Sequence, residues 1–267
     1  MLAALVTLVL AKDRIVNAAA KGIPVDWEVQ AGDAIFAQLT AMKRPLANDA
    51  INEQLQTITA PLVATMQDRR YPFQFHVIED PTLNAFAIPG GHVVIHTGLL
   101  LAADSPEEVA GVLVHEIAHV TKRHSIRNII SSAGLSALLQ TLVGDTTGLV
   151  GVLANNSAML MDRKFSRDFE READEAGWNS LLAARIRPAG MITFFEKLLD
   201  QERKAGGAGM PGSVMAAVST HPATQERIDR LRSRLALLPA ADYRAIGLNY
   251  ATFKEQLTLA MRRPGRL

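Results

Sequence analysis

The segment His115 to His119, which reads His-Glu-Ile-Ala-His, constrains this chain more than any other part of its sequence. Two histidines four positions apart lie about 40° apart around an α-helix, so both imidazoles can reach one metal ion when the segment is helical. Glu116 points to the side of that pair, where its carboxylate can take a proton from a water on the metal. The motif therefore predicts a chain folded around one metal-bearing helix.

The residues around the motif predict both that helix and its burial. Ser105 to Glu108 form a capping box with proline in the first helical position, and they start a helix that we expect to run to about His124. Buried ionisable groups need a partner, and a metal is one, so apolar flanks argue against two surface histidines beside a solvated glutamate. The apolar flanks are Val112, Leu113, Val114, Ile117, Ala118 and Val120.

The composition limits what can hold the metal. The 267 residues include no cysteine, which excludes disulfides, thiolate zinc sites and cysteine nucleophiles, so a metal must be held by the 7 histidines and 27 carboxylates. The hydrophobic share of 48% and the charged share of 21% are typical of a globular protein. The net charge of +1 gives no reason to expect a nucleic-acid partner.

A carboxylate-rich segment at 162–184 is predicted to be an amphipathic helix that supplies the third ligand. Zinc with two histidines needs a third protein ligand and an open position for water. Glu170 and Asp174 share one face with the small residues Ala173 and Gly177, which would let this helix approach another closely. We therefore expect Glu170 to bind zinc and Asp174 to accept a hydrogen bond from the far nitrogen of a zinc-bound histidine. The remaining acidic residues are expected to form a solvated face: Asp168, Glu172 and Glu175.

His221 is the candidate that stabilises negative charge on the substrate. In this chemistry Glu116 takes a proton from water and delivers it to the leaving amine, while a donor stabilises the oxyanion. Thr220-His221-Pro222 is predicted to open a helix that reaches about Leu238, and the helix dipole would keep the imidazole neutral. A neutral ring could also bind zinc as an inhibitory fourth ligand, or simply cap the helix. His124, beside two basic residues, is expected to be exposed.

The remaining sequence predicts an α+β fold, predominantly helical with a small antiparallel sheet. Segments 26–39 and 48–69 are predicted helices. The stretch 71–78 alternates apolar and polar residues, and 84–95 reads as strand interrupted by a turn at Pro89-Gly90-Gly91. Nearly all of the chain after this point is predicted to be helical.

Two apolar runs leave membrane association open. Leu2 to Ala11 is shorter than the roughly 20 residues that span a bilayer, so it reads equally as a buried first helix or as the end of a membrane helix. The segment 126–160 is predicted to form two apolar helices, either as a buried hairpin, which we slightly favour, or against a membrane.

Four segments in a fixed order carry a resemblance to a known family. They are Asn84 to Gly91, His115 to His119, Glu170 to Asp174 and Thr220 to Thr224. Together they resemble the HtpX, BepA and CAAX-prenyl-protease family of gluzincin-type zinc metallopeptidases, over roughly residues 30 to 238. The resemblance implies His115, His119 and Glu170 as zinc ligands, Glu116 as catalytic base and His221 as the family's His-Pro histidine.

The resemblance also implies how substrate is held. A strand hairpin covers the active-site cleft in this family, and its edge strand pairs with an extended polypeptide. Strand addition of this kind provides affinity through backbone hydrogen bonds with little sequence preference. In this chain the edge strand falls on Asn84, Ala85, Phe86 and Ala87.

The sequence departs from the family in its membrane segments and repeats. It contains no tetratricopeptide repeat and no clear membrane span, and Pro24 to Glu28 weakly match the membrane-proximal entry of anchored bacterial members. We divide the chain into an apolar N-terminal segment at 1–23, which includes the possible end of an anchor, a metallopeptidase domain at 24–240 and a C-terminal helical tail at 241–267.

The sequence-based hypothesis is a zinc endopeptidase with one Zn²⁺ per chain. We expect it to act on unfolded or misfolded proteins in the bacterial cell envelope, as a membrane-anchored or periplasmic enzyme. The alternative is a latent protease that works mainly as a chaperone or assembly factor, with its zinc site closed by His221.

Overall fold

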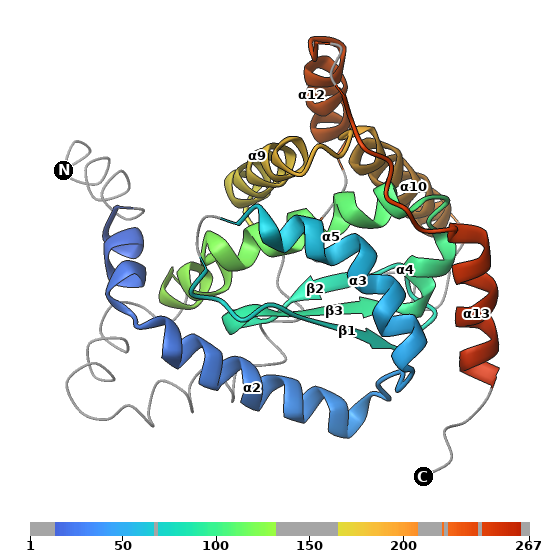
Figure 1. Cartoon of the computed structure of the whole chain (residues 1–267). Coiled ribbons are helices and arrows are strands. Elements are labelled where there is room, and N and C mark those ends of the chain that lie inside the picture. The colour runs from blue at the N-terminus through green and yellow to red at the C-terminus, as the bar shows by residue number, and fades with distance from the viewer. Residues whose placement is uncertain are drawn as a thin grey trace.

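The computed structural model describes residues 14–66, 69–131, 165–207, 221, 224–239 and 242–262. Helices surround a three-stranded sheet, as Figure 1 shows, and the expected predominance of helix is confirmed. Residues 14–22 and 124–131 are also helical. The named elements are α2 (Val25–Met42), α3 (Asp49–Ala64), β1 (Gln74–Ile78), β2 (Ala85–Ala87), η1 (Pro89–Gly91), β3 (His92–His96), α4 (Thr97–Ala102), α5 (Pro106–Thr121), α9 (Arg167–Ala183), α10 (Ala189–Gly207), α12 (Gln225–Ala236) and α13 (Tyr250–Arg262).

The sheet has the strand order β1-β3-β2 and is mixed. The expected antiparallel hairpin is β2 with β3, and its turn uses Gly90 and Gly91 at positive φ, where a side chain would be strained. β1 differs from the expectation because it pairs parallel with β3, with Phe75 opposite Val93. Apolar and polar residues alternate in the same way in parallel and antiparallel strands, so the alternation that predicted β1 could not reveal the direction of its pairing.

The strands bury both faces of the sheet, each against a different helix. Val93 and Ile95 pack in the main core with α5, while Val94 between them packs with Ile35 and Leu39 of α2. Figure 1 shows the result as layers, with α2 on one side of the sheet, α5 on the other, and α9 and α10 beyond α5. The helix that carries the histidine motif is therefore covered on most of its circumference.

Two of the sequence-based interpretations fall largely outside the described residues. These are the apolar run at 2–11 and most of the predicted apolar hairpin at 126–160. Among the helices that the structure describes, none is long and apolar enough to cross a membrane.

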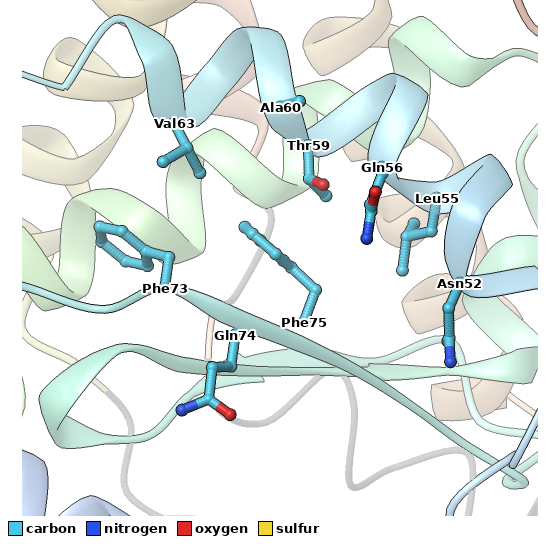
Figure 2. A pocket seen from close by; sticks show the side chains of 9 residues that line it. All are labelled: Asn52, Leu55, Gln56, Thr59, Ala60, Val63, Phe73, Gln74 and Phe75. Carbon is cyan, nitrogen blue, oxygen red and sulfur yellow. The ribbon is translucent and has the colours of Figure 1, made fainter. Parts of the chain in front are cut away.

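A groove of about 330 Å³ separates α3 from β1. Figure 2 shows Phe73 and Phe75 on one wall, facing Thr59 and Val63 of α3 on the other. Its lining includes amides and apolar groups but none of the residues expected to bind metal.

A glycine of α5 permits a close contact with α10. A Cβ added to Gly111 would lie 2.4 Å from the Cα of Met191, which is closer than real atoms approach. No flexible side chain can move to relieve this contact, because the neighbour is backbone.

We expect Gly111→Ala to destabilise the protein by forcing these two helices apart. The predicted loss is about 1–3 kcal/mol, or roughly 3–10 °C in the melting temperature. Thermal unfolding followed by circular dichroism measures it. Gly22→Ala is the matched control, since a Cβ on that helical glycine meets nothing within 4 Å. Equal melting temperatures for the two variants would contradict the packing argument.

Candidate metal centre

α5 and α9 bring together the three residues that the sequence nominates as metal ligands. Ser105 and Ser166 cap the two helices by accepting backbone N–H bonds. α5 begins where its sequence predicts, whereas α9 begins at Arg167, five residues after the predicted start at 162. Gly177 allows the helices to pack closely, because a Cβ there would lie 3.2 Å from the Val114 side chain and 3.3 Å from the His115 backbone. His115, His119 and Glu170 are all buried at this contact.

The spacing of the three side chains fits a tetrahedral metal. The Nε2 atoms of His115 and His119 lie 3.1 Å apart. Carboxylate oxygens of Glu170 lie 3.3 Å from the first nitrogen and 3.7 Å from the second. Two ligands about 2.0–2.1 Å from zinc in a tetrahedral arrangement are separated by roughly 3.3 Å. The donor set of two imidazoles and one carboxylate therefore fits zinc in both geometry and chemistry.

Asp174 lies where it can orient one of the imidazoles. Its Oδ1 is 3.2 Å from Nδ1 of His115, on the side of the ring away from the other donors. Burial lowers the pKa of His115, but the hydrogen bonds to Asp174 and Glu170 outweigh burial and raise that pKa to about 9 in the metal-free chain. His119 has no such carboxylate contact on its far nitrogen, and burial holds its pKa well below the ordinary value.

Two arginines of α12 neutralise the buried carboxylates, and sequence reasoning missed both. Arg227 lies 2.7 Å from Glu170 through Nη1, and it holds Asp174 through Nη2 at 2.6 Å and Nε at 3.0 Å. Arg230 adds a contact of 2.7 Å to Asp174. Burial raises the pKa of Glu170, but His221 and His115 outweigh it, and the pKa lies well below the ordinary value. Buried carboxylates need cations, and that requirement was the available signal for seeking arginines elsewhere in the chain.

His221 also reaches the centre, from outside the helix that was expected to hold it. α12 begins at Gln225 and is capped by Thr224, so His221 precedes the helix and does not receive its dipole as an N-terminal residue would. Its Nδ1 lies 2.9 Å from Glu170 and its Nε2 lies 3.7 Å from Glu116. One ligand atom from each of His115, His119, Glu170 and His221 falls within 4.8 Å of the others.

Glu116 occupies the side of the centre that faces the sheet. The backbone N–H of Ala87, at the end of β2, donates to Oε2 of Glu116 at 3.1 Å. Burial raises the pKa of the Glu116 carboxyl above its ordinary value. A buried, oriented carboxylate with a raised pKa is better suited than an ordinary carboxylate to accept a proton from water.

β2 forms one edge of the sheet, and its backbone alternates between the sheet and that edge. His96 N–H donates to Asn84 at 2.9 Å and Ile88 N–H donates to His92 at 2.8 Å, so even-numbered residues of this segment face β3. Ala85 and Ala87 consequently direct their backbone groups to the free edge. Of the four residues expected to contact substrate, these two have the backbone orientation that strand addition requires. The Ala87 N–H already donates to Glu116, so Ala87 offers a partner strand only its carbonyl.

His124 is buried, contrary to the expectation that it would be exposed. α5 ends at Thr121, and Arg123 adopts a left-handed conformation with φ of 57°, which turns the chain inward. The His124 side chain then lies between His119 and Glu172. Glu172 is therefore only partly exposed, with 37% of its side chain accessible to solvent. The expectation that it belongs to a solvated acidic face is wrong.

The family model for peptidase family M48 matches residues 49–235. The chain belongs to peptidase family M48. This membership confirms the recognition made from the four sequence motifs, and with it the metalloendopeptidase class of the chain.

Individual relatives are bacterial and mitochondrial proteases. The chain is 31% identical to the beta-barrel assembly-enhancing protease of Escherichia coli, over 82% of this chain and 46% of the relative. It is 33% identical to the mitochondrial metalloendopeptidase OMA1 of Schizosaccharomyces pombe, over 65% and 49%. It is 29% identical to the metalloprotease LoiP of E. coli, over 71% and 73%. The chain spans about half the length of the beta-barrel assembly-enhancing proteases that it matches.

We expect Glu170→Gln to weaken zinc binding severely, because the variant removes a charged donor and leaves Arg227 without one of its carboxylates. The loss should exceed the roughly 10–100-fold that removal of an outer hydrogen-bond partner costs. Competition with a chromophoric chelator measures the affinity. Glu175→Gln is the control, since that side chain lies on the same helix and is 67% exposed. Similar affinities in the two variants would show that Glu170 is not a ligand.

Proposed function

We propose that this chain is a zinc-dependent endopeptidase that hydrolyses peptide bonds in unfolded or misfolded polypeptides. The observation that carries the proposal is the convergence of His115, His119 and Glu170 at tetrahedral separations beside the buried carboxylate of Glu116. One Zn²⁺ per chain would be held by these three residues. When bound, zinc polarises a substrate carbonyl and acidifies a water molecule.

Glu116 acts as the general base in this proposal. Its carboxylate accepts a proton from the attacking water and passes that proton to the leaving amine. Burial raises the pKa of the Glu116 carboxyl above its ordinary value, which favours acceptance of a proton, and the hydrogen bond from Ala87 fixes its orientation. Because Ala87 belongs to β2, the base and the free strand edge are held in register with one another.

The substrate lies along β2 as an added strand. Ala85 presents its backbone N–H and C=O at this edge, and Ala87 presents its C=O, since its N–H already donates to Glu116. Asn84 and Phe86 keep their backbone groups in the sheet and contribute only side chains. A folded protein rarely offers an extended segment with unpaired backbone groups, so the geometry favours unfolded chains. Similarity to the beta-barrel assembly-enhancing protease of E. coli supports a role in the bacterial envelope, either periplasmic or membrane-anchored.

His221 contributes to the reaction by donating to the oxyanion of the substrate. Its two ring nitrogens face the carboxylates of Glu170 and Glu116. The same position favours a second candidate function, because His221 falls within the four-residue cluster and could close the metal site. In that case the chain is a latent protease that acts mainly as a chaperone or assembly factor.

We expect Glu116→Gln to retain zinc at the wild-type stoichiometry and to lose activity by about 10²–10⁴-fold, since the amide cannot accept the proton. Cleavage of casein with and without a chelator measures activity, and metal analysis of the same samples measures zinc. Activity in the variant that equals wild type and still depends on zinc would contradict the role of Glu116 as base.

We expect His221→Ala to lower kcat on the order of 10²–10³-fold, as removal of an oxyanion donor does. The same casein assay measures the change, with zinc affinity determined in parallel. A rise in activity together with weaker zinc binding would instead favour the latent protease, because the variant would then have opened a closed metal site.

A further inference from the structure

His115 and His119, the two proposed histidine ligands, have different hydrogen-bond partners on the ring nitrogens that face away from the candidate centre. Nδ1 of His115 meets the carboxylate of Asp174 directly. Nδ1 of His119 instead lies 2.9 Å from Nδ1 of His124, a second imidazole. Nε2 of His124 in turn lies 3.2 Å from Oε2 of Glu172. A row of three side chains therefore extends outward from His119 and ends on a carboxylate.

One arrangement of protons satisfies every nitrogen in this row. A histidine nitrogen that binds metal carries no proton, so His119, whose Nε2 faces the other donors, holds its proton on Nδ1. That N–H can donate to His124 only if Nδ1 of His124 is unprotonated. A neutral His124 then carries its proton on Nε2, from which it donates to the Glu172 carboxylate.

The surroundings hold His124 in place for this contact. Its side chain has no exposure to solvent, and its ring stacks on Phe169 with centroids 4.4 Å apart and planes 2° from parallel. The Arg127 guanidinium lies 4.2 Å from the centroid of the same Phe169 ring. Nη1 of Arg127 donates to Oε2 of Glu172 at 2.7 Å, so the final carboxylate is fixed as well.

The backbone conformation of Arg123 helps to bring His124 into contact with His119. Arg123 has a φ of 57°, which is unfavourable for any residue with a Cβ and persists where the surroundings compensate for the strain. The Arg123 side chain forms an ion pair with the buried Glu28 and donates to the backbone oxygen of Ile23 at 2.6 Å. The turn is thus anchored to the start of α2, and it places the His124 ring next to the His119 ring.

We propose that His124 and Glu172 are positioning residues that hold His119 in the tautomer and orientation in which its Nε2 faces the metal. This inference rests on the proposed function, since it takes His119 to be a zinc ligand. Hydrogen-bond partners on the far nitrogen of a ligating histidine are usually a carboxylate, a backbone carbonyl or water. Here an imidazole stands between the ligand and its carboxylate.

Zinc affinity in four variants tests the proposal. His124→Phe keeps an aromatic ring against Phe169 but removes the acceptor for His119, and we expect zinc to bind about 10–100-fold more weakly. His124→Asn restores an acceptor and should recover part of that loss. Glu172→Gln should weaken binding by a smaller factor. The double variant His124→Phe with Glu172→Gln should bind no more weakly than His124→Phe alone, because both changes break one row.

Controls separate positioning from a general loss of packing. Affinity is measured by competition with a chromophoric chelator, and the melting temperature of each metal-free variant reports whether the fold survives. The matched control variant is Asp168→Asn. Asp168 lies on α9, as Glu172 does, and 88% of its side chain is exposed, so this variant should bind zinc as wild type does.

Wild-type zinc affinity in a folded His124→Phe variant would overturn the inference. So would a loss of affinity in the double variant that equals the product of the losses in the two single variants. Should His124→Phe fail to fold, Glu172→Gln decides, because it keeps both imidazoles and wild-type affinity in it would overturn the inference. A wild-type chain that binds no zinc would contradict the proposed function itself, which is a distinct result.

Discussion

The burial of Glu170 and Asp174 against two histidines is the constraint on which the rest of this structure depends. Each of these residues has at most 2% of its surface exposed, and burial without partners would make ionised groups of this kind untenable. Arg227 supplies the counter-charge by contacting both carboxylates, and it comes from α12. The proposed third ligand Glu170, the Asp174 carboxylate that faces His115, and α12 are consequently tied together by one guanidinium.

The same constraint links the centre to the sheet. α5 must lie close enough to α9 for His115 to reach Asp174, and Gly177 permits this approach. It must also lie close enough to β2 for the Ala87 N–H to donate to Glu116. The base, the proposed ligands and the free strand edge therefore occupy fixed positions relative to one helix. A site of this kind is organised in advance of substrate, so the extended substrate that we propose would pair with β2 with little reorganisation.

The sequence predicted those parts of the centre that depend on local geometry. The spacing of His115 and His119 and the helical face that separates Glu170 from Glu172 follow from the period of an α-helix, and the capping box at Ser105 follows from the unpaired N–H groups at a helix start. The parts it did not predict arise from contacts between distant elements or from a single backbone dihedral. Arg227 gives no local sign that it is buried, the parallel pairing of β1 depends on the path of the chain, and His124 turns inward because Arg123 leaves the helical conformation.

The central claim is that two imidazoles and one carboxylate hold a catalytic zinc ion. Anomalous diffraction from crystals of the zinc-loaded protein, measured on both sides of the zinc absorption edge, tests it most directly. We predict one anomalous peak per chain, about 2.0–2.2 Å from Nε2 of His115, Nε2 of His119 and a carboxylate oxygen of Glu170. A fully loaded crystal whose zinc lies elsewhere, or is not bound by these three side chains, would contradict it.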